Sequence, residues 1–344
     1  MAGAHLCSRH SCLLSNLSNR ERIDPLHRPG LGNRSMRSPE NQREREVTAM
    51  SEFLAANLPH LLSGISVGGQ YALIAIGYTM VYGILRLINF AHGDVFMVAG
   101  LVMVYATASL PIYVSIILVV VVTVALGVLI EKVAYRPLRS APRMSVMISA
   151  IGVSYLLQNC ALYFTGGLPQ IYPSIPFLSK QVQIGTASTK MVTIITPILT
   201  VILVIVLVMM IKKTKVGMAM RAVSRDFETS ELMGIKINNV ISMTFAIGCF
   251  LAAIGSLLYF TNYNSVIPTS GAMPGLKAFV AAVFGGIGSV PGAVVGAFVI
   301  GICENIIKGM GLTEFSDAFT FVLLIVILLV KPTGIFGEKS TDKV

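Results

Sequence analysis

Residues 112–130 read IYVSIILVVVVTVALGVLI, an uncharged stretch long enough to cross the hydrocarbon core of a bilayer as one helix. Its apolar run from Val114 to Leu129 does not alternate with polar residues, so it does not resemble a strand of an outer-membrane barrel. This stretch therefore favours helical membrane spans over a barrel.

Further stretches of the same kind occur along the chain, and the composition agrees with them. Hydrophobic residues make up 54% of the 344 residues and charged residues 12%. An ordinary soluble domain has roughly 25% charged residues. The further apolar runs lie at 58–85, 88–110, 145–165, 190–211, 238–260 and 316–330. Together with 112–130 and one broken region, these runs predict an all-α, polytopic membrane protein with about eight hydrophobic segments.

The broken region is 276–308, where GGIGSVPG at 285–292 interrupts the apolar sequence. Glycine and proline disfavour a continuous helix, so we expect a broken or re-entrant helix pair there. Irregular backbone at membrane depth is tolerated only where it is packed in protein or lines an aqueous cavity. The positive N-terminal ends of broken helices can also face an anionic group. The break therefore indicates a transport path.

The glycines of the break allow two interpretations. As part of a path, the candidate residues are Gly285, Gly286 and Gly288. As a packing notch, Gly285, Gly288, Gly292 and Gly296 have the small-residue spacing of closely packed helices. The spacing alone leaves both interpretations open.

The basic residues lie between the apolar runs and indicate orientation. Residues 131–143 carry four basic residues against one acidic residue, and residues 212–236 carry six against three. Loops of that sign normally stay in the cytoplasm, so we predict that both are cytoplasmic and that the first span starts outside. The net charge of +10 thus reflects membrane topology, and we expect no nucleic-acid partner.

Residues 1–49 are a different kind of sequence. They contain eight arginines, no lysine, five acidic residues and no long apolar run, so they cannot bury a core. We predict that they are disordered or precede the true start, for which Met50 is the candidate. Their histidines and cysteines lack the spacing of a zinc site, and we expect no metal ion or cofactor in the chain. The membrane domain is then 50–337, followed by a cytoplasmic tail at 338–344.

Few polar residues fall within the apolar runs. Asn89, His92 and Asp94 lie in RLINFAHGDVFM, where the first two spans join, and burying them is costly unless they are paired or hydrated. They either cap the second helix, for which Asn89 is suitable, or line a gate. Proton coupling by His92 is disfavoured, because no series of intramembrane carboxylates accompanies it. Glu304 has either a helix-end role or contact with substrate.

The largest polar insertion begins at Lys212, and we predict one amphipathic helix in it, from Ala219 to Leu232. Gly234 would end this helix. Its apolar positions are Met218, Ala222, Leu232 and Met233, and its polar positions are Arg221, Arg225, Asp226 and Glu228. Such a helix suits a partner protein or a surface of anionic lipid, and composition does not separate the two.

Enzyme motifs are absent from the sequence. There is no G-x-x-x-x-G-K-[ST], no H-E-x-x-H and no G-x-S-x-G. We therefore predict that the chain is not an enzyme. Uphill transport would need an ion gradient or another subunit.

Several blocks of the sequence resemble one family, in the right order and from about residue 50 to residue 337. The family is the permease of high-affinity branched-chain amino acid ABC importers, in particular the smaller of its two permeases. The blocks are GGQYALIAIGYTMVYGILRLINFAHGDVFM (68–97), EKVAYRPLR (131–139), SAIGVSYLLQN (149–159), GMAMRAVSRDFETSELMGIKINNVISMTFAIG (217–248), GLKAFVAAVFGGIGSVPGAVVGAFVIGICENI (275–306) and KPTGIFG (331–337).

The resemblance implies a bacterial inner-membrane importer of leucine, isoleucine and valine. Its partners would be a second permease, two ATP-binding subunits, a periplasmic substrate-binding protein and membrane lipid. The loop that would couple this chain to the ATP-binding subunits is matched by Gly217, Arg221, Ala222, Asp226, Gly234 and Ile235. Tyr71 and Tyr78 would supply dipoles along an otherwise apolar path. The alternatives are an ion-driven carrier or channel, or a permease for urea, amides or other amino acids.

Overall fold

The structure is a computed structural model that describes residues 39–139, 141–184, 187–331 and 333–337. The predictions for 1–38, including the absence of a zinc site there, and for the tail 338–344 lie outside the described residues. The first helix begins at Pro39, so it includes the end of the segment 1–49 for which the sequence predicts disorder.

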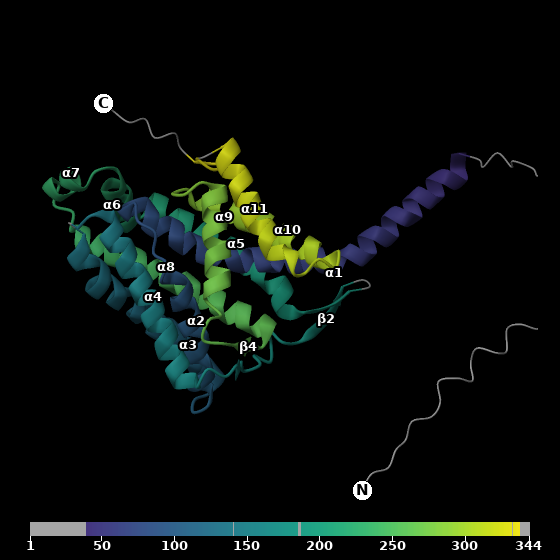
Figure 1. The fold of residues 1–344 in the computed structure, drawn as a ribbon, viewed down its shortest axis with the longest axis horizontal. Coiled ribbons are helices and arrows are strands. Elements are labelled where there is room, and N and C mark those ends of the chain that lie inside the picture. The colour runs from purple at the N-terminus through teal and green to yellow at the C-terminus, as the bar shows by residue number, and fades with distance from the viewer. Residues whose placement is uncertain (1–38, 140, 185–186, 332, 338–344) are drawn as a thin grey trace, which may run out of the picture. The chain divides into compact units, whose positions relative to one another are not determined.

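The described chain consists of helices with two small antiparallel sheets (Figure 1). The helices are α1 (Pro39–Leu85), α2 (His92–Thr107), α3 (Ile112–Ile130), α4 (Arg143–Thr165), α5 (Met191–Lys213), α6 (Lys215–Arg225), α7 (Phe227–Leu232), α8 (Ile237–Tyr263), α9 (Ala272–Gly285), α10 (Val290–Gly309) and α11 (Phe315–Val330). A π-helical turn, Glu131–Tyr135, and a 3-10 turn, Arg136–Leu138, extend α3. The all-α prediction is confirmed.

The short strands lie in the α4–α5 and α8–α9 connections. β1 (Gln170–Ile171) pairs with β4 (Ser265–Val266), with Gln170 opposite Val266. β2 (Gln181–Ile184) and β3 (Ala187–Lys190) form a hairpin just before α5. The strands add no layer to the fold.

Within the described residues, six helices are long and apolar enough to cross a membrane. They include α1 from Leu58, α3 with its extension, α4, α5, α8 and α10. Three shorter apolar helices, α2, α9 and α11, accompany them. The broken region 276–308 is therefore a pair of helices, as predicted, and the count of about eight segments is not confirmed.

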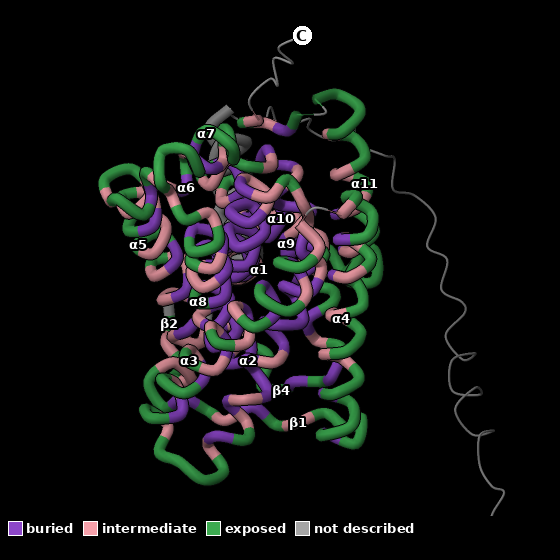
Figure 2. Tube along the Cα trace, turned by 90° about the vertical axis from the view of Figure 1, so that its left-hand side faces the viewer, coloured by how far each residue is buried: buried purple, intermediate pink, exposed green. Residues whose placement is uncertain are grey.

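The core is built around α1. Every residue from Ser66 to Val81 is buried. Glycine permits this burial where helices touch: a Cβ on Gly68 would lie 2.8 Å from the backbone of Phe298 in α10. A Cβ on Gly100 in α2 would overlap the ring of Phe260 in α8 at 2.6 Å or less. Figure 2 shows the buried residues gathered along α1, α8, α9 and α10.

The outer helices present large aliphatic side chains to their surroundings. Of the most apolar 18-residue stretch of each helix, at most 22% is buried in α3, α4 and α5, against 78% in α1. Exposed side chains such as Ile117, Ile148 and Ile198 are therefore positioned to contact lipid or another apolar surface.

Candidate functional site

The helix α2 begins inside the protein. It starts at His92, not near residue 88 as the sequence predicts, because Asn89 folds the preceding residues into a turn. The Asn89 Oδ1 accepts hydrogen bonds from the Ala91 N–H at 3.1 Å and from the Tyr135 hydroxyl at 2.8 Å. Asn89 thus shapes the turn before the helix, and Ala91 occupies the cap position. With 16 residues, α2 is about 24 Å long, less than the hydrocarbon thickness of a bilayer.

His92 and Asp94 are both buried, but their surroundings differ. Asp94 accepts hydrogen bonds from the Ser154 hydroxyl and, at 3.0 Å, from Gln158 Nε2, so it joins α2 to α4. His92 fills a notch between α1 and α8, where a Cβ on Gly77 would overlap its ring. Within the described part of the chain its Nε2 has no hydrogen-bond partner. Asp94 is thus held by hydrogen bonds and His92 by packing, and a role of either residue in a gate stays a prediction.

The N-terminal ends of α2 and α9 meet in backbone contact. A Cβ on Gly93 would lie 2.7 Å from the Gly271 carbonyl oxygen and 3.0 Å from Gly275 Cα. Tyr78 of α1 closes the junction: its hydroxyl would be 3.2 Å from a Cβ on Gly275, and its ring packs edge-on against His92. Two short helices therefore start at one place in the interior, which brings together the positive ends of their dipoles. We call this place the α2–α9 junction.

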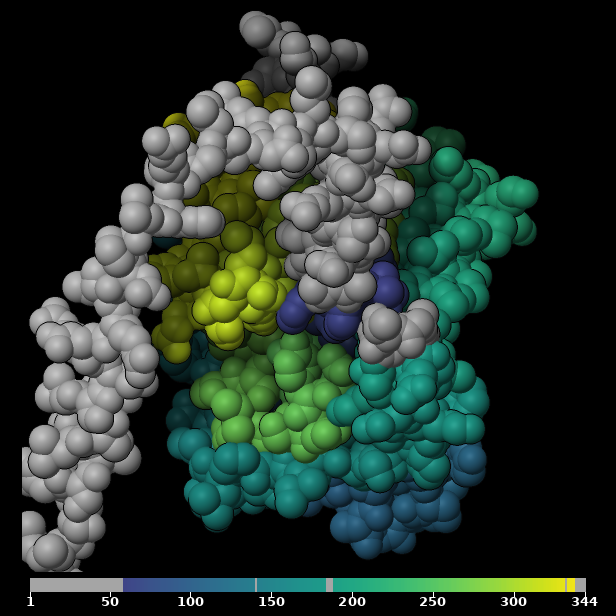
Figure 3. Space-filling model, turned by 90° about the vertical axis from the view of Figure 1, so that its right-hand side faces the viewer, coloured from purple at the N-terminus to yellow at the C-terminus, as the bar shows by residue number. Residues whose placement is uncertain are grey.

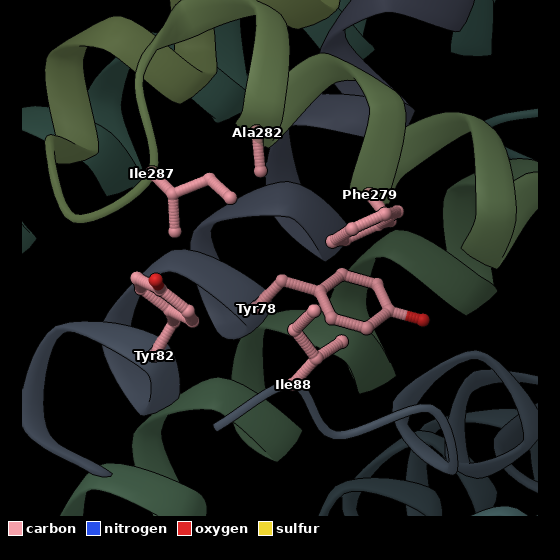
Figure 4. Close-up of a pocket in the computed structure, with 6 residues that line it drawn as sticks. All are labelled: Tyr78, Tyr82, Ile88, Phe279, Ala282 and Ile287. Atoms are coloured by element: carbon pink, nitrogen blue, oxygen red, sulfur yellow. The ribbon is translucent and has the colours of Figure 1, made fainter. Parts of the chain in front are cut away.

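An apolar pocket lies beside the α2–α9 junction. Its lining comes from α1, α9 and the two connections next to them, with Tyr78, Tyr82, Ile88, Phe279, Ala282 and Ile287. Figure 4 shows these side chains gathered around a common space. The free volume is only about 10 Å³, which is room for about one water molecule. A leucine side chain fits here only after the walls separate.

The break between α9 and α10 lies within the predicted breaker. Gly286 and Gly288 have φ values of +107° and +100°, a region that glycine adopts readily. Gly285 instead lies against Gly292, and a Cβ on either residue would overlap the backbone of the other. The backbone N–H groups of residues 335–336 donate to the last carbonyl groups of α9. Packing and turn geometry thus account for these glycines, and their place on a path stays a prediction.

Glu304 lies at the centre of a buried charge cluster. Its side chain is 1% exposed, and its Oε1 accepts hydrogen bonds from Lys277 Nζ at 2.8 Å and Lys308 Nζ at 2.6 Å. Its Oε2 accepts one from the Tyr71 hydroxyl at 3.0 Å. Lys277 also pairs with Asp317 at 2.5 Å. The cluster joins α1, α9, α10 and α11, and its two lysines balance its two carboxylates.

A cavity of about 250 Å³ opens beside this cluster. We call it the charged cavity, because all four charged side chains line it. The rings of Tyr71, Tyr259 and Tyr263 form much of the rest, with Met273 and Pro274. Figure 3 shows a face on which the α8–α9 connection (green) and the α10–α11 connection (yellow) lie next to each other, and the cavity is lined from both sides of that boundary.

The segment 212–236 forms two short helices, so the prediction of one helix from Ala219 to Leu232 is wrong. α6 ends before Asp226, whose side chain accepts hydrogen bonds from the backbone N–H groups of Glu228 and Thr229 and thereby starts α7. The Thr229 hydroxyl also donates to this carboxylate, and these bonds lower the pKa of Asp226 below its usual range. An N-cap in the middle of the segment breaks the helix.

The predicted apolar face of this segment is also wrong. Met218, Leu232 and Met233 are 60%, 88% and 79% exposed. Met220 and Val223 are buried in their place. The end of α7 leaves two apolar side chains free to contact a partner.

The six predicted coupling residues occupy distinct places in the segment. A Cβ on Gly217 would overlap the backbone at the end of α5, so this residue permits the tight turn from α5 into α6. Arg221 is exposed, and Ala222 and Ile235 are half-buried. Gly234 has a φ of +79° and follows the last turn of α7, which confirms it as the end of that helix.

A buried ion pair links this segment to the α2–α9 junction. Glu131 is fully buried, pairs with Arg139 and accepts a hydrogen bond from the Ser242 hydroxyl in α8 at 2.6 Å. Four residues further on, Tyr135 donates to Asn89 in the turn before α2. The start of α8, which directly follows segment 212–236, is thereby connected to the start of α2. The sequence offered a signal for Glu131, since it is the one acidic residue in 131–143.

Lys277 and Asp317 are further residues that the sequence prediction did not include. Lys277 is the one charged residue between positions 276 and 303. A single lysine in such an apolar stretch needs a buried partner, which points to Glu304. Asp317 lies at the start of the last apolar run and carried no such signal.

Comparison with known proteins shows that the sequence of this chain is similar to those of transport proteins. A family model described as "branched-chain amino acid transport system / permease component" matches residues 60–328. The high-affinity branched-chain amino acid transport system permease protein LivH of Escherichia coli (strain K12) is 39% identical over 310 residues, which cover 86% of this chain and 100% of the relative. The corresponding protein BraD of Pseudomonas aeruginosa is 38% identical over 300 residues, covering 83% and 98%. The ribose import permease protein RbsC of Haemophilus influenzae is 24% identical over 281 residues, covering 80% and 84%.

Proposed function

The chain belongs to the family of permease components of the branched-chain amino acid transport system, and from this premise we propose that it carries leucine, isoleucine and valine across the bacterial inner membrane. It is a multi-pass permease subunit of an ABC importer. The observation that carries this function is the 39% identity to LivH over the whole length of that relative. The chain is not an enzyme, because ATP hydrolysis in such importers belongs to partner subunits.

An ABC permease works together with partner subunits. We propose four of them here: a second permease, two ATP-binding subunits and a periplasmic substrate-binding protein. The exposed aliphatic faces of α3, α4 and α5 suit both membrane lipid and the apolar surface of a second permease.

The ATP-binding subunits would dock on α6 and α7. The segment 212–236 has the positive charge of a cytoplasmic loop. The exposed Leu232 and Met233 give it an apolar contact, which favours a protein partner over a purely electrostatic contact with lipid headgroups.

Movement of this segment would reach the membrane interior through α8. The ion pair of Glu131 with Arg139 and the bond from Ser242 hold the start of α8 against the end of α3. Tyr135 passes the displacement to Asn89 and so to the start of α2. Closure of the ATP-binding subunits would then favour one of two arrangements of these packed helices.

The α2–α9 junction is the proposed gate of the path, with Tyr78, Asn89, His92 and Asp94 around it. Two helix N-termini there suit the carboxylate of an amino acid, and the apolar pocket beside them suits an aliphatic side chain. Because the pocket is closed to about 10 Å³, this conformation represents a closed gate.

Reconstituted transport tests this function. Liposomes that contain the chain, its partner subunits and ATP should take up leucine, and liposomes with the chain alone should not. Leu232→Glu should prevent co-purification of the ATP-binding subunits. Leu168→Glu, at an exposed position outside the segment, is the matched control and should leave co-purification unchanged.

Two results would contradict the proposal. Uptake by the chain alone under a proton or sodium gradient would indicate a secondary carrier. Uptake of urea or short amides in place of leucine would overturn the substrate.

A further inference from the structure

The charged cavity holds more charge than packing requires. Burying charged side chains among apolar helices is costly, and well-packed apolar residues often give equal or greater stability. Of the four charged side chains here, Lys277 and Glu304 are almost fully buried, and Lys308 and Asp317 are partly buried. The cavity of about 250 Å³ beside them also leaves space unfilled. Charge and space together indicate a ligand.

We propose that the charged cavity binds the zwitterionic head of an amino acid, with Lys308 at its carboxylate and Asp317 at its ammonium group. This assignment rests on the proposed function and adds a substrate site to it. The site is separate from the α2–α9 junction, which the proposed function treats as the gate.

The four charged residues divide into an inner pair and an outer pair. Lys277 and Glu304 are 6% and 1% exposed, and each has at least two charged or hydrogen-bonding partners. Lys308 and Asp317 are 30% and 44% exposed and have one ion-pair partner each. An ammonium group has three donors and a carboxylate about four acceptor sites, so Lys308 and Asp317 each keep about two free, whereas Lys277 and Glu304 each keep about one.

The charge balance selects the class of ligand. Two lysines and two carboxylates sum to zero, so an ion of one sign would add an uncompensated charge to a partly buried site. A zwitterion adds none, and it can place its two charges against opposite members of the outer pair.

The remaining walls suit an aliphatic side chain. Tyr259, Tyr263, Met273 and Pro274 provide apolar and aromatic surface next to the charged groups. Apart from Tyr71 and Thr313, the lining comes from the ends of α8 and α10 and from the first turns of α9 and α11. With 131–143 and 212–236 in the cytoplasm, the charge pattern of the sequence predicts that this side is outside. A ligand there would occupy the entrance of the path.

Protection of a cysteine from labelling tests the site. Thr313→Cys places a thiol on the cavity wall in a background without the natural cysteines, in the fully assembled importer. Leucine, titrated up to its solubility limit, should slow reaction with a methanethiosulfonate reagent several-fold. Leucinamide, which lacks the carboxylate, and 4-methylpentanoate, which lacks the ammonium group, should not.

Variants of the outer pair make the test specific. Lys308→Gln and Asp317→Asn should each abolish protection by leucine while the inner pair stays in place. Lys331→Gln, at an exposed position that does not line the cavity, should keep it. Co-purification of the ATP-binding subunits shows that each variant is folded.

The outcomes separate this inference from the proposed function. Unchanged labelling in an importer that takes up leucine with ATP would overturn the charged cavity as a binding site and leave the function standing. Protection of the cysteine by leucine without any ATP-driven uptake would overturn the proposed function and leave the charged cavity standing as a binding site. Slow labelling that depends on partner subunits and not on leucine would overturn the inference, because a partner's side chain would then fill the cavity.

Discussion

Removing the central carboxylate of the charge cluster should destabilise the protein strongly. In Glu304→Leu, two lysines and the Tyr71 hydroxyl lose the acceptor that they share. Breaking a buried pair by deleting one partner costs about 3–5 kcal/mol. The cavity admits water that screens the remaining charges, so we expect the lower half of that range, about 3–4 kcal/mol. That is roughly two to three orders of magnitude in the unfolding equilibrium constant.

Replacing Lys277, which pairs with Glu304, should destabilise the protein less, and it should offset part of the cost of Glu304→Leu when the two are combined. Lys277→Met leaves Glu304 paired with Lys308 and Tyr71, so we expect the free energy of unfolding to fall by about 1–3 kcal/mol. In the double variant an apolar pair replaces a buried ion pair. The double variant should therefore lose at least about 1 kcal/mol less free energy of unfolding than the sum of the losses in the two single variants.

The assay is reversible unfolding of the full chain in bicelles by denaturant titration, followed by circular dichroism. Glu228→Leu, at an exposed position, is the control and should change the free energy of unfolding by no more than about 0.5 kcal/mol. A Glu304→Leu cost below about 1 kcal/mol, or simple additivity in the double variant, would refute the coupling energy assigned to the cluster.

Three further predictions concern the gate and its coupling. Gly93→Val drives a side chain into packed backbone at the α2–α9 junction, so ATP-driven leucine uptake should fall at least tenfold; Gly152→Ala, whose Cβ meets nothing within 4 Å, should transport normally. Tyr135→Phe removes a hydrogen bond worth about 1 kcal/mol and should lower the leucine transported per ATP hydrolysed, without loss of assembly. Equal coupling in this variant and in Tyr113→Phe, an exposed control, would contradict the connection. The pKa of Asp226 is lowered, so its stabilisation of α7 is present above the unfolded pKa and is lost only as pH falls through the lower folded value. Co-purification of ATP-binding subunits should therefore be equal at pH 7 and pH 5, and a loss at pH 5 that Asp226→Asn reproduces at pH 7 would count against this.

Most of the fold can be predicted from the apolar runs of the sequence. Length and hydropathy identify the long spans, and the breaker at 285–292 correctly separates α9 from α10. The start of α2 was placed too early, because the turn depends on Asn89 and on Tyr135 from a distant helix. Such long-range hydrogen bonds leave no periodic signal in a sequence.

The candidate site was predictable only in part. Tyr71 and Glu304, proposed separately, lie within hydrogen-bonding distance of each other. Asp317 was not foreseeable, because an acidic residue at a helix start is common without any buried partner. The division of segment 212–236 at Asp226 was missed because amphipathic periodicity hides an N-cap within a run of polar residues.

The side of the membrane on which segment 212–236 lies tests the whole account most directly. A single cysteine in place of Lys236, which is exposed and lies outside α6 and α7, in a background without the natural cysteines, would be treated with a membrane-impermeant maleimide in intact and in permeabilised cells. An ATP-driven permease predicts labelling only after permeabilisation. Labelling of intact cells would place the segment outside, beyond the reach of any ATP-binding subunit.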